Sequence, residues 1–581
     1  MILQSLYDYY QRLAADPNSE VARPGFTMEK IGFALVLNAN GELVGNKITD
    51  LRDSKKKPRM MLMPEGVKRS RNTAANFLWD NSSYILQVDD KENPDRTKEH
   101  HQAFQDLHEA MLSELDDVGA KALPSFLRNW APDQFEALPF HDVIIKGGFI
   151  CFQLLHDGQL EFLHKRPVLQ SQWLKHVSAE ENVSTGQCLI TGKDNVAIAR
   201  LHTQIRGVIG ANTTGASIAG INFTAGESQG QSQYFNAPVS EDAVFAYTTA
   251  INRLLAPNSR QKITIADTTV VIWAKKKDRC EPALIDILFG PPSEEEAESE
   301  DDALYARNIL DVLVKARQGH NVSIALSKLA EYPGQPIFIL GLAPNAARLS
   351  VRFWETESLE KLVGRVGQHY ADIEIVGKRD IITPLSLLRQ TAVQGKQSNI
   401  PFRLVGDLLQ AILTGSKYPL SLYSVLLVRI RAERIVNQSR AAMIKGILVR
   451  NFPNPNKEIL TMSLNTKTTD VAYRLGRLFA VLEGLQYSAV RPSATIKDRY
   501  FGAASSTPAS VFPNLLRNAQ NHISKIGWGD QPVQEILTSI NEFPPHLDMQ
   551  QQGRFIIGYY HQRQDHFEKI AAHKENNNEE A

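Results

Sequence analysis

The sequence predicts an α+β protein, with a mixed region of β-sheet and long loops over residues 1–375 and an all-α helical bundle over residues 376–581. The first observation is that β-rich runs alternate with helical patterns up to about Ile375. Beyond this residue, apolar side chains recur only with the 3.6-residue period of helices. The second observation is length, because 581 residues exceed what one hydrophobic core organises and predict about two to four domains.

The N-terminal elements are predicted in chain order. Apolar periodicity over 3–13 predicts an amphipathic helix, and two β-rich runs flanking Asn40 and Gly41 predict a hairpin. The basic stretch 55–72 contains two prolines and a glycine, which favours a loop. Residues 75–89 are expected to end in a strand. Helices are expected over 97–115 and 124–130.

Further β-rich runs over 141–273 surround a long polar loop, 206–236, which contains six glycines. A loop of this length without its own secondary structure is typical of functional or disordered segments. The acidic residues of 291–302 favour an exposed linker. A helix over 303–317, a strand over 336–343, and a turn followed by another strand within 344–355 complete the mixed region.

Composition places the chain among ordinary globular proteins, since 43% of its residues are hydrophobic and 22% are charged. No apolar run reaches the roughly 18 residues of a membrane span, and no export signal is expected. Its three cysteines, Cys151, Cys188 and Cys280, lie far apart and form no CxxC motif. We therefore expect no disulfide framework and no zinc site, and a cytoplasmic location.

Charge is distributed unevenly, although the net charge is zero. Residues 418–527 carry fifteen Lys and Arg against five Asp and Glu, a local net charge of +10, whereas 294–302 is acidic. This asymmetry indicates a polyanionic partner for the basic region. The alternative is a solvated helical face.

The sequence contains no catalytic motif. P-loop, GxGxxG, HExxH and GxSxG patterns are absent, and the acidic residues do not form the paired clusters of two-metal nucleases. His101 and His108 lie two turns apart on one polar helix, whereas a helical metal pair needs i, i+4 spacing. We expect no active site, no metal and no cofactor.

Five blocks carry a resemblance to a known family. They are RNTAANFLWDNSSYIL (71–86), IRGVIGANTTGASIAGINFTAGESQGQSQYFNAPVSEDAVFAYTTAINRLL (205–255), ILGLAPNAARLSVRFW (339–354), YPLSLYSVLLVRIRAERIVNQSRAAMIKGILVR (418–450) and YFGAASSTPASVFPNLLRNAQNHISKI (500–526). In sequence and in their order along the chain, these blocks resemble the Csd-type large subunit of the type I-C CRISPR surveillance complex, Cascade. The resemblance implies a subunit that lies beside the guide-RNA ribonucleoprotein backbone, recognises a short protospacer-adjacent motif in double-stranded DNA and helps open the duplex. Its implied partners are the backbone subunits, a small subunit, the target DNA and a helicase–nuclease, with no membrane.

The same resemblance implies that the C-terminal region can also be translated separately, as the small subunit. Met462 precedes a purely helical pattern and is the first candidate for the internal start, giving a product of 462–581. Met443 is the second candidate. The alternative is that Met443 is packed in a helix and Met462 lies in a linker.

The basic stretch 55–72 is the first candidate binding region, because its prolines and glycine present cations on a loop. We expect Lys68, Arg69 and Arg71 to hold the DNA backbone and Asn72 to read a base edge, since an amide both donates and accepts hydrogen bonds. The alternative is a solubilising loop in which Asn72 caps the following segment. Further backbone contacts are expected from Lys55, Lys56, Lys57 and Arg59.

The glycine-rich loop is the second candidate, because glycines let backbone N–H groups approach sugar and phosphate closely. Its uncharged side chains suit minor-groove acceptors or a wedge between opened strands. The alternative is a surface insertion without a partner. The residues expected to contact DNA are Asn212, Thr213, Gln229, Gln231 and Gln233.

The late helices are the third candidate, as a sequence-independent track for phosphates. Arg429 and Arg440 are eleven residues apart and share a face if their helix is continuous. About half of these cations are expected to contact nucleic acid, while others pair with acids such as Glu433, Glu483 or Asp498. The full set is Arg429, Arg434, Arg440, Lys445, Arg450, Arg474, Arg477, Arg491, Lys497 and Arg499.

Two other functions compete with a DNA-binding scaffold. One is a metal-dependent nuclease that uses Asp80, Asp89 and Asp90. The other is a general RNA-binding protein.

Overall fold

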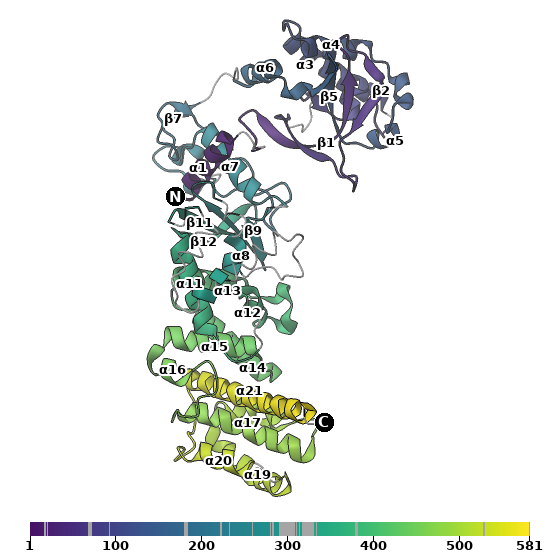
Figure 1. The fold of residues 1–581 in the computed structure, drawn as a ribbon. Coiled ribbons are helices and arrows are strands. Elements are labelled where there is room, and N and C mark those ends of the chain that lie inside the picture. The colour runs from purple at the N-terminus through teal and green to yellow at the C-terminus, as the bar shows by residue number, and fades with distance from the viewer. Residues whose placement is uncertain are drawn as a thin grey trace. The chain divides into compact units, whose positions relative to one another are not determined.

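A computed structural model of the chain divides into two compact units, an N-terminal unit of residues 1, 3–203 and 220–250 and a C-terminal unit of residues 2, 204–219 and 251–581 (Figure 1). The described residues are 1–581 except 17, 18, 20, 68–72, 92, 179–183, 221–223, 232, 258, 279, 280, 282, 283, 290–307, 309, 310, 313, 317–330, 333, 378–381, 527, 528, 580 and 581. Among the helices in these ranges, none combines the length and the apolar character needed to cross a bilayer.

The N-terminal unit is built on a mixed six-stranded sheet whose central strand is β1 (Phe26–Leu37). Its apolar run from Ile31 to Leu37 is buried throughout, so both faces of the sheet are covered there. β1 pairs in parallel with β5 (Phe149–His156) and antiparallel with β2 (Leu43–Asp50) and β3 (Arg59–Pro64). The strands β4 (Trp79–Asp80) and β6 (Gln159–Phe162) pair with β5.

The predicted hairpin at Asn40 and Gly41 is confirmed, with Leu37 opposite Leu43 across the β1–β2 turn. Asn38 Oδ1 accepts from the backbone N–H groups of Asn40 and Glu42 at 3.0 and 2.9 Å, and Gly41 has φ +83°. A Cβ at Gly41 would also lie 2.4 Å from a carbonyl oxygen of the adjacent helix, so glycine is required there.

Two other predictions for this unit are wrong. The basic stretch 55–72 is not all loop, because Arg59–Pro64 forms β3; Pro58 precedes this edge strand and Pro64 ends it, positions that strands tolerate. The strand expected at the end of 75–89 is instead the short helix α2 (Ser82–Ile85), since the Asn81 side chain accepts from Ser83 N and starts a helical turn.

Helices α3 (Pro94–Leu112) and α4 (Val118–Asn129) pack on this sheet, and Phe104, Phe126 and Phe152 meet in its core. The expected helices over 97–115 and 124–130 are thus confirmed, with shifted ends. The unit also contains α1 (Ile2–Ala15, from residue 3 on), α5 (His141–Ile144), α6 (Pro167–Ser178), β7 (Thr185–Gly186), β8 (Val196–Ala197) and most of α7 (Glu241–Leu254).

The C-terminal unit begins with an antiparallel four-stranded sheet in the order β12 (Arg348–Ser358), β11 (Pro336–Asn345), β10 (Thr268–Ala274), β9 (Lys262–Ile265). Helices α11 (Leu359–Ile373) and α13 (Phe402–Thr414) contact β12, and their apolar faces share one core with the sheet. The expected linker at 291–302 lies outside the described residues, as does most of the helix expected over 303–317.

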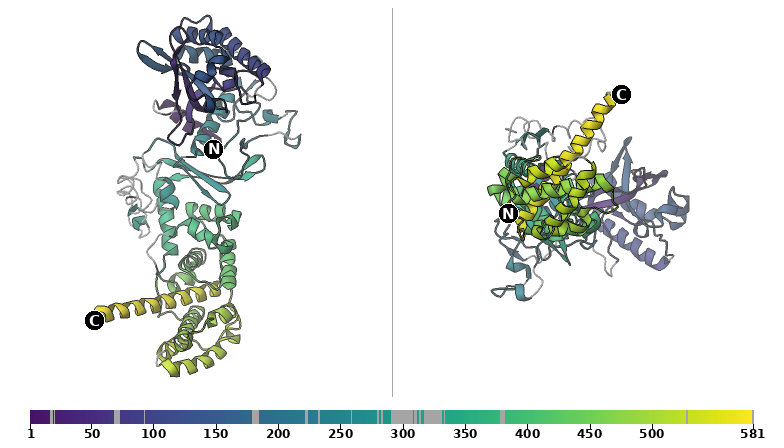
Figure 2. Two further views of the ribbon diagram at one scale, coloured as in Figure 1. Left: turned by 90° about the vertical axis from the view of Figure 1, so that its right-hand side faces the viewer. Right: turned by 90° about the horizontal axis from the view of Figure 1, so that it is seen from below.

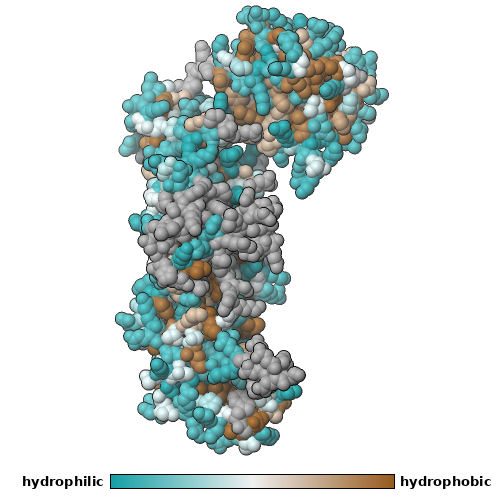
Figure 3. Space-filling view, viewed as in Figure 1, coloured by the Kyte–Doolittle hydropathy of each residue, from teal (hydrophilic) through white to brown (hydrophobic). Residues whose placement is uncertain are grey.

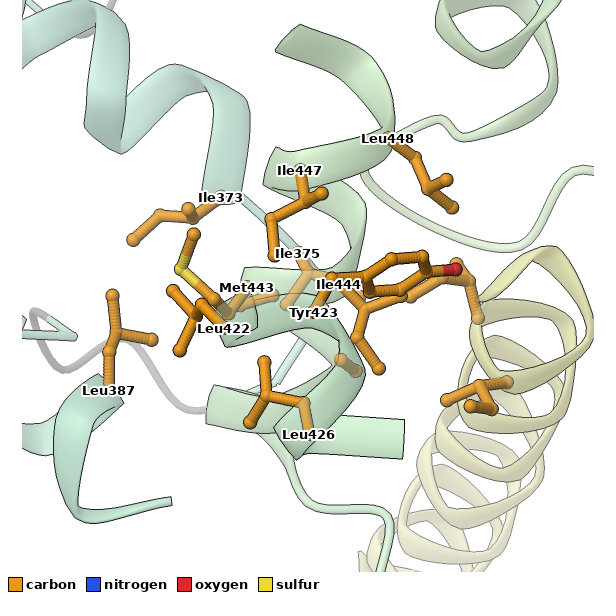
Figure 4. Close-up of a cluster of buried hydrophobic side chains, with 14 of the residues drawn as sticks. Ile373, Ile375, Leu387, Leu422, Tyr423, Leu426, Met443, Ile444, Ile447 and Leu448 are labelled. Atoms are coloured by element: carbon orange, nitrogen blue, oxygen red, sulfur yellow. The ribbon is translucent and has the colours of Figure 1, made fainter. Parts of the chain in front are cut away.

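The following residues are helical, as predicted. α14 (Leu420–Glu433) and α15 (Gln438–Asn451) pack together, and Figure 4 shows Leu422 and Leu426 pointing toward Met443 and Ile447 with Tyr423 beside α21. α17 (Val471–Val490) packs most extensively on α21 (Met549–Glu579), and Figure 2 shows α21 passing between α15 and the α17–α20 helices. Other α-helices formed by the described residues of this unit are α8 (Leu284–Phe289), α12 (Pro384–Arg389), α16 (Pro453–Ile459), α18 (Ile496–Ala504), α19 (Phe512–Ile526) and α20 (Asp530–Leu537).

The expected domain boundary at residue 375 does not coincide with the division into compact units. One continuous core runs from Ile265 and Val270 of the second sheet through α11 and α15 to Tyr560 of α21. The sheet buries its face on helices that follow it in the chain, so contacts do not thin out at residue 375.

Candidate nucleic-acid interface

The tight turn between β2 and β3 presents Lys55, Lys56 and Lys57, and Arg59 follows as the first residue of β3; all four predicted cations are exposed. Asp53 organises the turn, because its Oδ1 accepts from Lys55 N at 2.8 Å and from Lys57 N at 2.9 Å. The backbone of Asp53 makes two further hydrogen bonds within the turn: Asp53 N donates to Lys57 O, and Lys56 N donates to Asp53 O, each at 2.9 Å. The side chain of Lys56 is 70% exposed, with Nζ 3.7 Å from Asp50 Oδ2.

Arg52 fixes the base of this turn to the sheet. Its Nε and Nη2 donate to the two carboxylate oxygens of Asp50, each at 2.8 Å, and its guanidinium lies 4.5 Å from the centre of the Phe33 ring. The same bidentate hydrogen bond holds the pKa of Asp50 down at about 2. Arg52 is therefore engaged within the fold, and the turn directs a separate set of cations toward solvent.

The residues expected to hold and read the motif, Lys68, Arg69, Arg71 and Asn72, lie outside the described residues. The chain on either side of them is joined, since Asn76 Oδ1 accepts from Val67 N at 2.9 Å. Asn76 is itself buried and its backbone N–H donates to Asp80 Oδ2 at 3.0 Å. This joint attaches both ends of the predicted segment to the N-terminal unit.

The first half of the glycine-rich loop is folded onto the second sheet. Ser217 O accepts from Leu349 N at 2.9 Å, and Ile205 and Ala216 bridge across the excursion. Gly215 has φ +109°, and a Cβ there would lie 2.6 Å from Gln204 Cβ, so glycine is required for this turn. Asn212 and Thr213 are exposed at its tip, where Asn212 O accepts from Gly215 N at 2.9 Å.

The second half of the loop forms a separate turn in the N-terminal unit. Gln229 adopts φ +53° and is followed by a glycine at +73°, and Gln231 N donates to Ser228 O at 2.9 Å. Asn236 Nδ2 donates to Gln231 O at 2.7 Å and holds the turn closed. Gln229 and Gln231 are exposed, while the side chain of Gln233 lies outside the described residues.

The condition that Arg429 and Arg440 lie on one continuous helix is not met, because the chain breaks between α14 and α15. Arg434 ends α14 in the left-handed conformation at φ +57°, and Asn437 starts α15 by accepting from Arg440 N. Arg429 and Arg440 nevertheless converge, since both form ion pairs with Glu433. Arg440 is only 4% exposed, and burial lowers its pKa.

Four further predicted cations are also held inside the C-terminal unit. Arg450 Nε bonds Asp372 Oδ2 at 2.6 Å, with the guanidinium 4.1 Å from the centre of the Tyr418 ring. Lys445 Nζ donates to Glu374 O at 2.6 Å, and burial lowers its pKa. Arg474 and Arg477 hold α20, through Ile536 O at 3.0 Å and Glu535 Oε1 at 3.1 Å respectively. These side chains join elements of the fold and are not placed to contact a phosphate.

The remaining predicted cations face outward. Arg434 and Arg491 are exposed in left-handed positions at the ends of α14 and α17, and Arg499 is exposed on α18, where Lys497 is partly buried. In the view of Figure 3, hydrophilic residues cover much of the described surface at this helical end, with hydrophobic residues exposed among them. Of the ten predicted helical cations, these four are available to a polyanion.

Two cations that sequence reasoning missed, Arg563 and Lys569, line the same groove as Arg491. They come from α21, more than seventy residues later in the chain. No spacing rule within one helix could have associated them with α17. A signal was present only as basic residues in an otherwise amphipathic terminal helix.

Among the acidic and histidine candidates, Asp80 and His108 have structural partners. Asp80 is buried, and its carboxylate accepts from the backbone N–H groups of Asn76 at 3.0 Å and Asn81 at 2.9 Å. His108 Nδ1 donates to Phe104 O at 2.7 Å while its Nε2 accepts from Leu78 N at 2.9 Å, an arrangement that requires the neutral ring. Burial favours this neutral form, because it lowers the pKa of His108 to about 4. Within the described ranges, no group of three or more His, Cys, Asp or Glu side chains is arranged to hold a metal.

Comparison with known families supplies the remaining observation. The model of the family described as CRISPR-associated protein (Cas_Csd1) matches residues 6–567. No curated protein matches the chain.

Proposed function

Because the chain belongs to the CRISPR-associated Cas_Csd1 family, we propose that it is the non-catalytic large subunit of a type I-C Cascade complex in the cytoplasm. In this role it recognises the protospacer-adjacent motif in double-stranded DNA, helps unwind the duplex and stabilises the R-loop. Its partners are the guide-RNA backbone subunits, a small subunit and a helicase–nuclease that carries out cleavage in antiviral defence.

The observation that carries the proposal is the lysine turn, defined as Lys55, Lys56, Lys57 and Arg59. The turn organised by Asp53 exposes three lysines, and the first residue of β3 exposes Arg59 beside them. Such a group of cations suits phosphate contacts, which position a protein on DNA without reading sequence. In an RNA-guided complex, base pairing with the guide reads most of the target, so the protein reads only the short motif. The lysine turn therefore supplies sequence-independent attraction next to the segment that reads the motif.

Motif reading is assigned to Asn72, which lies on the basic segment joined to the unit by the Val67–Asn76 hydrogen bond. Exposed amides and hydroxyls at two tight glycine turns, Asn212 with Thr213 and Gln229 with Gln231, are proposed as the groups that approach the opened duplex.

Replacing Asn72 by Ala tests the reading role. The variant is expected to lose discrimination between target DNA with the correct motif and target with a scrambled motif, measured by competition binding of the assembled complex. Asn129→Ala, at an exposed position on α4, is the matched control and keeps the discrimination. Unchanged discrimination in Asn72→Ala would reject the assignment.

The non-catalytic part of the proposal has its own test. The purified chain is expected to leave supercoiled plasmid and guide RNA intact in Mg²⁺ or Mn²⁺, since cleavage belongs to the helicase–nuclease. Metal-dependent nicking that copurifies with the chain and disappears in Asp89→Asn would instead establish the nuclease alternative. RNA binding by the chain alone as tight as DNA binding by the complex would favour the general RNA-binding alternative.

A further inference from the structure

A groove of about 800 Å³ lies between the C-terminal half of α17 and the middle of α21, with Pro532 of α20 at one side. None of the contacts described above uses it. The two helices cross closely further along, where Gly476 and Gly558 bring their backbones together, and they diverge toward Arg491. The groove is therefore a consequence of how α17 and α21 cross.

Two aromatic side chains are exposed in the groove. Tyr487 of α17 is 57% exposed and Phe567 of α21 is 49% exposed, and both rings line this one groove. The guanidinium of Arg563 lies 5.3 Å from the centre of the Phe567 ring. Flat aromatic faces beside a guanidinium are the surfaces on which unpaired bases stack.

The charges available to an occupant are positive. Glu483 is 8% exposed and accepts from Tyr559 Oη at 2.6 Å and Thr495 Oγ1 at 3.0 Å, so its charge is satisfied by the protein. Asp565 is paired with Lys569 Nζ at 2.8 Å. Arg491 is exposed at the rim, and Thr495 leads directly into α18, which carries Lys497 and Arg499.

We propose that this groove, lined by Tyr487, Phe567, Arg491 and Arg563, binds single-stranded nucleic acid. In the complex the occupant would be the strand displaced when the duplex opens, a step that rests on the function proposed above. Bases stack on the two rings while Arg491, Lys497 and Arg499 contact the phosphates between them. A duplex does not fit this role, because its base faces are already stacked on one another. An apolar partner helix would leave the basic rim without counter-charges.

The first test uses the full-length chain and a free single strand, and does not depend on duplex opening. Tyr487→Ala and Phe567→Ala are each expected to weaken binding of an oligothymidylate about tenfold, since one base–aromatic stack is removed. Tyr487→Phe keeps the ring and keeps the affinity. The matched control is Phe402→Ala, because Phe402 is 48% exposed and lies 5.2 Å from Arg352 and 5.9 Å from Arg403 yet is outside the groove.

Equal loss in the Phe402 variant, or no loss in either groove variant, would overturn the proposal. Capture of a partner protein through the groove while strand binding stays unchanged would also overturn it. Circular dichroism of each variant shows whether it is folded, and photo-crosslinking of an iodouridine strand to the wild-type chain provides a second readout, with crosslinks expected at Tyr487 or Phe567.

The second test uses the assembled complex and iodouridine placed in the displaced strand of a target duplex. Crosslinks at the groove support the proposal. If the duplex opens and crosslinks form only elsewhere, the groove assignment fails while the proposed function stands. If the complex binds target without opening it, the proposed function fails, and the binding of the free oligothymidylate decides the groove on its own.

Discussion

Neutralising the lysine turn is the perturbation whose size follows most directly from the structure. Lys55, Lys56 and Lys57 are exposed on a turn that backbone atoms and Asp53 hold, so changing them to Gln removes three charges and leaves the turn's hydrogen bonds in place. Each phosphate contact contributes about 0.9 to the slope of log K against log salt concentration. Three lost contacts reduce the slope by about 2.7, or by about 1.8 if Lys56 stays beside Asp50.

The assay is DNA binding by the assembled complex from 50 to 200 mM salt. Over this range the wild-type affinity is expected to fall about 40-fold more than that of the triple variant, because a slope difference of about 2.7 acts over a fourfold change in salt. Lys98, Lys121 and Lys165, which are exposed on other elements of the same unit, changed together to Gln form the control. An unchanged slope in the turn variant, or an equal change in the control, would refute the reasoning.

Three further predictions test the helix packing, the burial of His108 and the internal translation start. Gly476→Ala places a Cβ 1.9 Å from Phe555 O and forces α17 and α21 apart, so urea unfolding should show that the C-terminal unit loses about 1–3 kcal/mol of stability. Gly502→Ala is the control, because a Cβ there has nothing within 4 Å and should cost no stability. An equal loss of stability in the two variants would contradict the close crossing of these helices. The buried His108 has a pKa of about 4 against an ordinary 6.5, so the unfolded chain binds the proton at a higher pH than the folded chain does. Acidification from pH 7 to 5 should therefore lower the stability of the N-terminal unit by about 2 kcal/mol. His108→Gln should remove this part of the pH dependence of stability, and an unaltered pH dependence in the variant would contradict the prediction. Met462 is 54% exposed between α16 and α17, so Met462→Leu should leave the full-length chain folded. If translation of the small product starts at Met462, the same change should remove that product from a gel. Persistence of the small product would exclude Met462 as its start.

The periodicity of the sequence was sufficient to predict most of the elements. The first helix, the hairpin at Asn40 and Gly41, the strands of the second sheet and the late helices all follow from patterns with a single period and clear turn residues. The short helix α2 was missed because Asn81 starts it within an apolar run that also suits a strand. The strand β3 was missed because a basic, proline-bounded segment is stabilised only by pairing with a distant part of the chain, β1.

The candidate interface was predictable in its loops but not in its helices. Exposure of the lysine turn follows from local composition, with Asp53 as the residue that closes it. Which arginines face inward depends on partners far away in the sequence, such as Asp372 for Arg450 and Glu535 for Arg477. A count of basic residues cannot separate a cation that joins two helices from one that contacts a ligand.

The central claim is tested most directly by assembling the guide-RNA complex with and without this chain and following opening of a target duplex by permanganate reactivity of its displaced strand. The account predicts that opening requires the chain, depends on the adjacent motif and weakens when the lysine turn is neutralised. A complex that lacks the chain and still opens its target with the same motif preference would contradict it.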